Sequence, residues 1–270
     1  MLLLAPTQLD HLERTPSTVL IMSAPLFLFY LLQAAQSVLF AWIAVDVLHS
    51  IAIAGQLFII ANLIQLFIGP LSAVFVDKLG GRITSIAGSG AVTLSYILLL
   101  AVDPAGKDHG AYLLLSASIA ALGHCILYPV LEALVQARSD SGENVAAVVS
   151  KNVVRQIGMI CGTGSSGVLI GIIGVGGSLW VLTGLCCIAG GITVAVFPPG
   201  HHWGRSSGQS FIKSLEEGVR VILQPWMLLP ACLLVLTWVV SQITNATLAA
   251  HVSANALGSR VYGAADAFWS

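Results

Sequence analysis

The stretch VLIMSAPLFLFYLLQAAQSVLFAWIAV, residues 19–45, carries no charged side chain from end to end. An α-helix needs about 20 apolar residues to cross the roughly 30 Å hydrocarbon core of a bilayer, and this stretch is long enough. Further apolar runs lie at residues 51–76, 83–102, 111–136, 152–174, 177–198 and 227–252. The sequence therefore predicts an all-α membrane protein with seven spanning helices, and residues 268–270 are consistent with the start of an eighth.

The overall composition fits a protein that lies in lipid rather than in water. Hydrophobic residues make up 57% of the chain and charged residues 9%, and the mean hydropathy is +0.92. About a quarter of the residues of a soluble domain are charged, so these few charges cannot cover a water-exposed surface. The net charge is -1 and no basic cluster stands out, so the lipid bilayer is an expected partner and nucleic acid is not.

The cysteines and histidines do not indicate a metal or cofactor site. The five cysteines lie in apolar runs, with neither metal-ligand spacing nor the loop positions of a disulfide framework, and we interpret them as small core residues. They are Cys125, Cys161, Cys186, Cys187 and Cys232. His201 and His202 are adjacent and cannot close a metal site alone. We therefore expect no cofactor.

The basic residues lie on alternate connectors, which predicts the orientation of the chain. Asp10 and Glu13 give the N-terminal segment the wrong charge for a cleaved signal peptide, so the first span is expected to remain. With a cytoplasmic N-terminus, Lys107 and Arg260 lie outside and the other basic residues lie inside. The inside residues are Arg14, Lys78, Arg82, Arg138, Lys151, Arg155, Arg205, Lys213 and Arg220. This bias predicts a multi-pass protein of the cell membrane, inner or plasma, with its N-terminus in the cytoplasm.

The connector from Pro198 to Pro225 is the longest in the chain and divides it. A Gly/Ser-rich piece is followed by apolar residues at helical spacing, which predicts an amphipathic helix on the membrane surface. We expect a cytoplasmic N-terminal tail at 1–18, a six-helix transmembrane bundle at 19–198, a cytoplasmic linker at 199–226 and the start of a second bundle at 227–270.

The connector after the second span reads AVFVDKLGGR, residues 73–82. An aspartate at a helix end accepts bonds from backbone N–H groups and pairs with a nearby cation, and glycines let the chain reverse within a few residues. Asp77, Lys78, Gly80 and Arg82 are therefore predicted to form a compact latch on the cytoplasmic side. The alternative is an ordinary basic turn.

The fifth span contains the glycine-rich segment GMICGTGSSG, residues 158–167. Gly158 and Gly162 lie four residues apart, as do Gly167 and Gly171, so each pair occupies one face of a helix. Such pairs permit a neighbouring helix to approach closely.

Both segments resemble signatures of the major facilitator superfamily. The connector is similar to its cytoplasmic loop signature between the second and third spans, with Ala73 in place of the leading glycine and Gly81 in place of a basic residue. In the family, this loop bridges two halves of the transporter and helps to hold one gating state. The resemblance therefore implies a gating role for the predicted latch.

The glycine-rich segment is similar to the signature of the superfamily's antiporters through Gly158, Gly162 and Gly167. Thr163 stands where proline is usual, and Ser166 where glycine is usual. Weaker matches are Gln36-Ser37, Gly69-Pro70, Tyr128-Pro129 and Tyr262-Gly263. Together the matches resemble the siderophore and multidrug exporter branch, over essentially the whole chain.

The resemblance implies a transporter in which two six-helix bundles rock about a shared site. It further implies efflux of a small molecule, with protons as a possible coupling ion, although the fourth span lacks the central arginine of many proton-coupled members. Because family members carry twelve helices, the chain is expected to be truncated and to need a C-terminal half or a second chain.

Polar residues inside predicted spans are candidates for the substrate or ion pathway, because a charged group at the membrane centre costs roughly 2.5–3.5 kcal/mol. The amides are expected to line a cavity, since an amide that faces lipid has no hydrogen-bond partner. Glu132 is either a protonatable gate or an interfacial carboxylate that pairs with Arg138 or Arg155, and His124 is either a pathway or a packing residue. The candidates are Gln33, Gln36, Asn62, His124, Glu132, Arg155 and Asn245.

Two other classes of protein remain as alternatives. A non-transporting multi-pass receptor or scaffold is expected if the polar clusters face lipid or saturate one another. The segment GSSG at 164–167 fits the nucleophile pattern of an intramembrane protease, with His251 as its base, but His251 falls at the outer end of its helix. We therefore expect no enzymatic activity, and the sequence leaves the substrate open.

Overall fold

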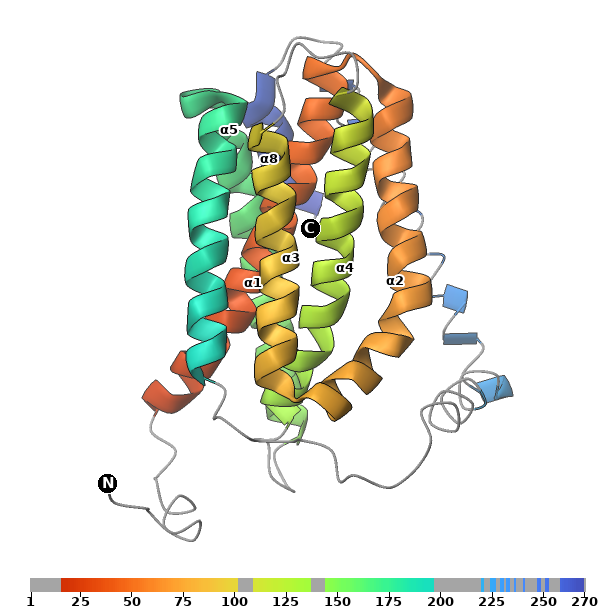
Figure 1. Cartoon of the computed structure of the whole chain (residues 1–270), viewed down its shortest axis with the longest axis vertical. Helices are drawn as coiled ribbons and strands as arrows, with labels where there is room; N and C mark the ends of the chain where they lie inside the picture. The colour runs from red at the N-terminus through yellow and green to blue at the C-terminus, as the bar shows by residue number, and fades with distance from the viewer. Residues whose placement is uncertain are drawn as a thin grey trace, which may run out of the picture.

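The computed structural model describes most of the N-terminal two thirds of the chain as a bundle of long helices (Figure 1). The described residues are 16–101, 109–136, 144–196, 220, 224–226, 229–230, 232–233, 236, 240, 247–248, 251–252 and 258–269. These residues include no strand, and the all-α membrane class predicted from the sequence is confirmed.

Helix α1 (Pro16–Trp42) is the central element, and it continues into a π-helical turn, η2 (Ile43–Val47). In the most apolar stretch of this helix, 72% of the residues are buried within the bundle. The corresponding stretch of helix α2 (Ile51–Leu79) is 11% buried. A lipid-facing helix needs no protein cover, because hydrocarbon chains solvate its side chains. The sequence could not distinguish these two helices, because both are strongly apolar, with mean hydropathies of 1.8 and 2.1.

Helix α2 and helix α3 (Gly81–Ala101) are joined by the single residue Gly80. Its φ is 81°, a value that glycine adopts without strain because it has no Cβ atom. The Gly80 N–H donates to the Val76 carbonyl oxygen at 3.0 Å. The Thr84 hydroxyl donates to the Gly80 carbonyl oxygen at 2.8 Å. Both helices therefore extend into the connector predicted at 77–82, because one glycine is enough to reverse the chain.

Helix α4 (His109–Gln136) packs against α3 where glycines of the two helices meet. A Cβ atom on Gly123 would lie 2.7 Å from the Gly88 carbonyl oxygen, and one on Gly88 would lie 3.0 Å from the Gly123 oxygen. Nearer the other end, the Ser116 hydroxyl donates to the Ser95 carbonyl oxygen at 2.7 Å. Because glycine has no side chain, the two backbones can approach closely and make polar contacts.

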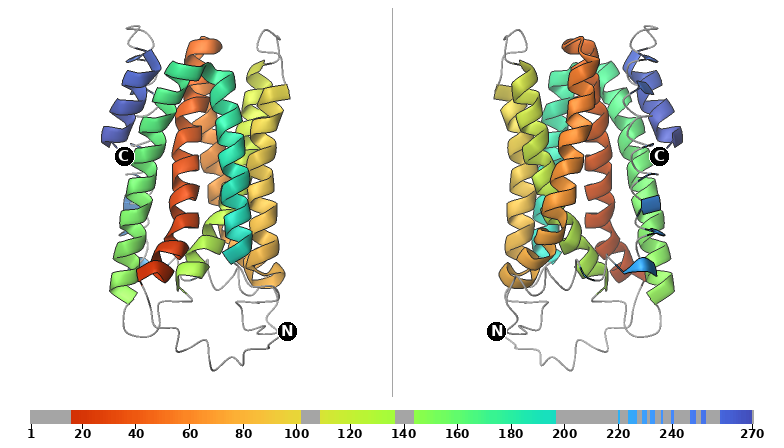
Figure 2. Two further views of the ribbon diagram at one scale, coloured as in Figure 1. Left: turned by 90° about the vertical axis from the view of Figure 1, so that its left-hand side faces the viewer. Right: turned by 90° about the vertical axis from the view of Figure 1, so that its right-hand side faces the viewer.

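Helix α5 (Asn144–Val196) turns back on itself at Gly174, where φ is 72° and ψ is -179°. Its two limbs run in opposite directions from this turn (Figure 2). They correspond to the spans predicted at 152–174 and 177–198. The first limb begins earlier than predicted, at Asn144, because hydropathy detects only the apolar part of a helix that also projects beyond the membrane.

The C-terminal part of the chain is described less fully. Helix α8 (Gly258–Trp269) lies against the first limb of α5 (Figure 2), so this helix begins well before the entry predicted at 268–270. Most of the predicted seventh span at 227–252 lies outside the described residues, as do nearly all of the linker at 199–226 and most of the tail at 1–18. Their assignments stay predictions.

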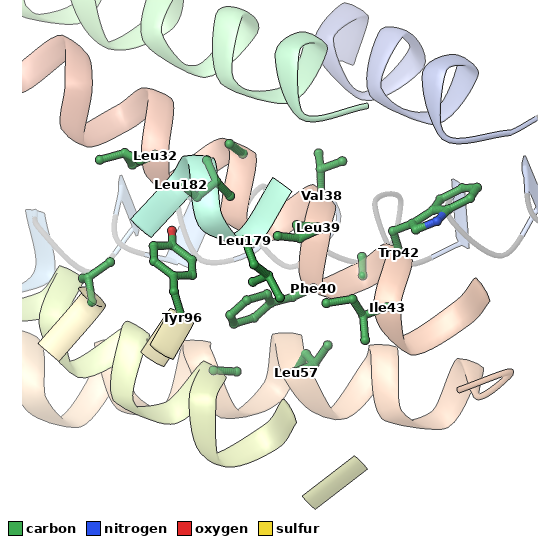
Figure 3. Close-up of a cluster of buried hydrophobic side chains, with 14 of the residues drawn as sticks. Leu32, Val38, Leu39, Phe40, Trp42, Ile43, Leu57, Tyr96, Leu179 and Leu182 are labelled. Atoms are coloured by element: carbon green, nitrogen blue, oxygen red, sulfur yellow. The ribbon is translucent and has the colours of Figure 1, made fainter. Parts of the chain in front are cut away.

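The core joins α1 to the second limb of α5 and to α3. Figure 3 shows Leu39 and Phe40 of α1 beside Leu179 and Leu182 of α5, with Tyr96 of α3 between the helices. All five side chains are buried. Among the described residues, five helices are long and apolar enough to cross a membrane. Because α5 turns back at Gly174, its two limbs supply two crossings.

Candidate functional site

A polar cavity of about 80 Å³ lies between α1, α2 and α4. The amides of Gln33, Gln36 and Gln65 and the hydroxyl of Ser37 line it from the first two spans, and apolar residues complete its wall. The lining consists of Gln33, Gln36, Ser37, Phe40, Ala41, Leu57, Phe58, Ala61, Gln65, Ala117, Ala121 and His124. The described lining contains no lysine, arginine, aspartate or glutamate.

Two hydrogen bonds order the α1 side of this cavity. The Tyr96 hydroxyl of α3 donates to Gln36 Oε1 at 3.1 Å, in a fully buried position. The Ser37 hydroxyl donates to the Gln33 backbone oxygen at 3.1 Å. The sequence identified Gln36 and Ser37 as polar residues of a membrane helix, but it gave no sign that Tyr96, far along the chain, holds one of them.

His124 lies between the polar cavity and a smaller one of about 20 Å³ toward Phe29 and Leu131. Its ring meets that of Phe29 edge to face, with the centroids 5.4 Å apart. His124 therefore packs against a neighbour and also lines a cavity, and its role in the pathway stays a prediction.

The two other amide candidates have different positions. Asn62 is half-buried on α2 and is not among the lining residues, because the cavity face of α2 repeats every four residues through Leu57, Ala61 and Gln65. Its expected place in the cavity lining is thus not what the structure shows. Asn245 lies outside the described residues.

Glu132 pairs with Lys151 rather than with Arg155. The Lys151 Nζ atom is 2.5 Å from Glu132 Oε2, and the two side chains are 19% and 14% exposed. For the alternative of an interfacial carboxylate, the sequence predicted Arg138 or Arg155 as the partner, and Lys151 was expected at the end of a connector. Since α5 already begins at Asn144, Lys151 sits on a formed helix facing α4. Arg138 lies outside the described residues.

Arg155, one turn beyond Lys151, takes a different partner. Its guanidinium carbon lies 5.4 Å from the centroid of the Tyr30 ring on α1, the geometry of a cation–π contact. The Tyr30 ring also meets Tyr128 of α4 edge to face at 6.4 Å. Glu132 Oε1 is buried and accepts no hydrogen bond within the described part of the chain. This cluster of Tyr30, Tyr128, Glu132, Lys151 and Arg155 joins α1, α4 and α5 at one end of the bundle.

The predicted latch residues lie at the junction of α2 and α3. The backbones of Asp77 and Lys78 belong to the last turn of α2, and their side chains are not among those that the structure describes. Gly80 is the turn residue, and Arg82 is exposed in the first turn of α3. The structure thus places these residues at one turn, and their gating role stays a prediction.

The glycines of the antiporter-like segment face other helices. A Cβ on Gly158 would lie 2.9 Å from the Phe27 carbonyl oxygen of α1, and one on Gly162 would overlap the Leu31 carbonyl oxygen. Gly167 meets α8, since a Cβ on Gly263 would lie 2.8 Å from its Cα atom. The close approach expected from the spacing is present, with α1 and α8 as the neighbours. Its role in transport direction stays a prediction.

The serines of the GSSG segment already have hydrogen-bond acceptors. Ser166 donates to the Ala35 carbonyl oxygen of α1 at 2.9 Å, and Ser165 donates to the Gly162 carbonyl oxygen of its own helix at 3.2 Å. Among the described residues no group of three histidine, cysteine or acidic side chains is placed to hold a metal ion. His201 and His202 lie outside the described residues.

Fold and site together define a multi-pass membrane protein in which three helices line a polar cavity. The chain matches the family model of the Major Facilitator Superfamily over residues 24–269, and it belongs to this family. A comparison with curated proteins gave no match. Proteins of this family are membrane transporters rather than enzymes, so a bilayer and a small-molecule substrate are the partners of this chain.

Proposed function

We propose that this chain exports a small molecule by alternating access, with the polar cavity as part of the substrate pathway. The observation that carries the proposal is the cavity itself, because amides from two helices and an imidazole from a third converge inside an apolar bundle. A receptor or scaffold needs no such cavity, and its polar clusters would saturate one another. Efflux rests on the antiporter-like glycines at 158, 162 and 167, and the exporter branch rests on these glycines together with the weaker matches.

Alternating access requires two bundles that rock about a common site. We propose that a second bundle, from this protein or from another chain, closes the cavity on the side that α1, α2 and α4 leave uncovered. Asp77, Lys78 and Arg82 are then the latch between the bundles on the cytoplasmic side. Glu132 is proposed as the residue that carries a coupling proton, since one of its oxygens is buried and unbonded within the described residues.

Transport can be measured in inside-out membrane vesicles that contain the chain, with and without a coexpressed C-terminal bundle of the same family. Imposing a proton gradient, acidic inside, is expected to drive uptake of fluorescent amphipathic compounds. Asp77→Asn should slow uptake about tenfold, the effect of ~1.4 kcal/mol of lost charge-assisted bonding. Asp46→Asn is the matched control, because Asp46 is an exposed carboxylate in η2, at the end of the bundle opposite Asp77. Uptake no greater than in vesicles lacking the chain, under both conditions, would refute the proposal.

The proposed orientation, with a cytoplasmic N-terminus, can be tested by cysteine labelling. In a chain whose five native cysteines are replaced by alanine, Arg82→Cys and His49→Cys place single thiols at exposed sites on opposite ends of α2. In intact cells, a membrane-impermeant maleimide is expected to label position 49 and not position 82. Inside-out vesicles should reverse the pattern. Labelling of position 82 alone in intact cells would show that the chain has the opposite orientation.

A further inference from the structure

Gln36 is the amide of the cavity whose orientation is fixed by a second residue. It is 6% exposed, lies on the central helix α1, and contributes to the cavity wall. A free glutamine can present either its carbonyl oxygen or its amide N–H groups to a ligand, since both ends have nearly the same shape. What the cavity offers a substrate at this point depends on which end is turned inward.

Tyr96 decides the orientation because its own hydroxyl needs an acceptor. Its side chain is fully buried on α3, and its bond to Gln36 Oε1 at 3.1 Å is the hydrogen bond that the hydroxyl makes. A buried O–H group without an acceptor costs about 1–3 kcal/mol. The reversed amide would offer the hydroxyl a donor instead of an acceptor. The arrangement with Oε1 toward Tyr96 is therefore favoured.

The Tyr96 ring is itself held in place. It meets the ring of Phe40 edge to face, with centroids 6.4 Å apart and an interplanar angle of 82°. It belongs to the same buried cluster as Leu32, Leu179 and Leu182, which Figure 3 shows around it. Because Phe40 also lines the cavity, Tyr96 forms a second layer directly behind the lining.

We propose that Tyr96 is a positioning residue that makes Gln36 a hydrogen-bond donor, and that the transported molecule carries a neutral acceptor oxygen that binds there. The inference rests on the proposed function of the cavity. With Oε1 engaged by Tyr96, the two amide N–H groups of Gln36 remain for a ligand. The described lining has no lysine or arginine to neutralise an anion, so a carbonyl or ether oxygen fits better than a carboxylate.

Two neutral fluorescent probes test whether the purified chain in nanodiscs prefers a ligand with hydrogen-bond acceptors or one with a hydrogen-bond donor. Nile red has carbonyl and ether oxygens and no N–H or O–H group, whereas N-phenyl-1-naphthylamine has an N–H group and no carbonyl. The saturable binding above that of empty nanodiscs gives a dissociation constant for each. The wild-type chain is expected to prefer Nile red, and Tyr96→Phe is expected to reduce this preference about fivefold, the typical effect of one hydrogen bond.

A double-mutant cycle separates positioning from a structural effect. In the Gln36→Met background, the preference should already be lost, and adding Tyr96→Phe should change it by less than about twofold. Tyr112→Phe makes the same chemical change at an exposed tyrosine of α4 that is not part of the cavity lining, and should leave the preference intact. A preference that Tyr96→Phe leaves unchanged, or that it still alters in Gln36→Met, would overturn the inference.

The outcomes also distinguish this inference from the proposed function. Saturable binding without preference, together with proton-driven uptake in vesicles, contradicts only the role of Tyr96 and the acceptor class. The expected preference without uptake contradicts transport alone. The absence of saturable binding of both probes would show that the cavity is not a ligand site, and it would overturn the inference outright.

Discussion

Replacing Gly162 with alanine is expected to lower the free energy of unfolding of the chain by about 1–3 kcal/mol or more, the range for overpacking a close contact. The added Cβ would overlap the Leu31 carbonyl oxygen and lie 3.0 Å from the Ala34 Cβ atom, so α1 and the first limb of α5 must move apart. A backbone atom cannot rotate away as a flexible side chain can. The central helix would lose part of its interface with α5.

Gly164→Ala is the matched control on the same helix. There, the nearest atom to an added Cβ is the Ala267 Cβ at 3.9 Å, an ordinary van der Waals contact. Replacing an exposed or half-exposed helical glycine with alanine favours the helix by up to about 1 kcal/mol. Titration with sodium dodecyl sulfate, followed by circular dichroism, compares the two variants in the same micelles. Equal stabilities would show that α1 and α5 do not approach as closely as described.

Removing the cation of the Glu132–Lys151 pair is expected to have the second large effect. Lys151→Met leaves a mostly buried carboxylate without a partner and should destabilise the chain by roughly 2 kcal/mol. This is below the roughly 3–5 kcal/mol for fully buried pairs, because both side chains are partly exposed. The double variant Glu132→Gln, Lys151→Met removes both charges and should recover most of the loss. The measurement is the same unfolding titration.

The same variants test whether Glu132 has the proposed role in coupling. Glu132→Gln keeps the shape of the side chain but cannot exchange a proton, so uptake in inside-out vesicles should no longer respond to the proton gradient. Asp46→Asn again serves as the control. The stability prediction has its own contradicting outcome. If the double variant is no more stable than Lys151→Met in the unfolding titration, the Glu132 carboxylate gains no stability from its pair with Lys151. Gradient-dependent uptake by Glu132→Gln would exclude this residue as the coupling site.

The sequence by itself determined the solvent, the class and most of the helices of this protein. Apolar runs such as 19–45 are long enough to cross a bilayer, and hydropathy is a local property that requires no knowledge of neighbours. The connector at 73–82 and the glycines at 158, 162 and 167 pointed to the superfamily that the family model confirms. The exporter branch stays a prediction.

The tertiary structure alone decided which helix is central and which residues pair. Hydropathy is the same for a helix facing lipid and one facing protein, so α1 could not be told from α2. The partners of Gln36 and Glu132 come from helices distant along the chain, and no local pattern specifies which residues of α3 or α5 face them. Lys151 and Tyr96 became site residues only through packing, because the register between helices depends on close contacts such as Gly162 against Leu31.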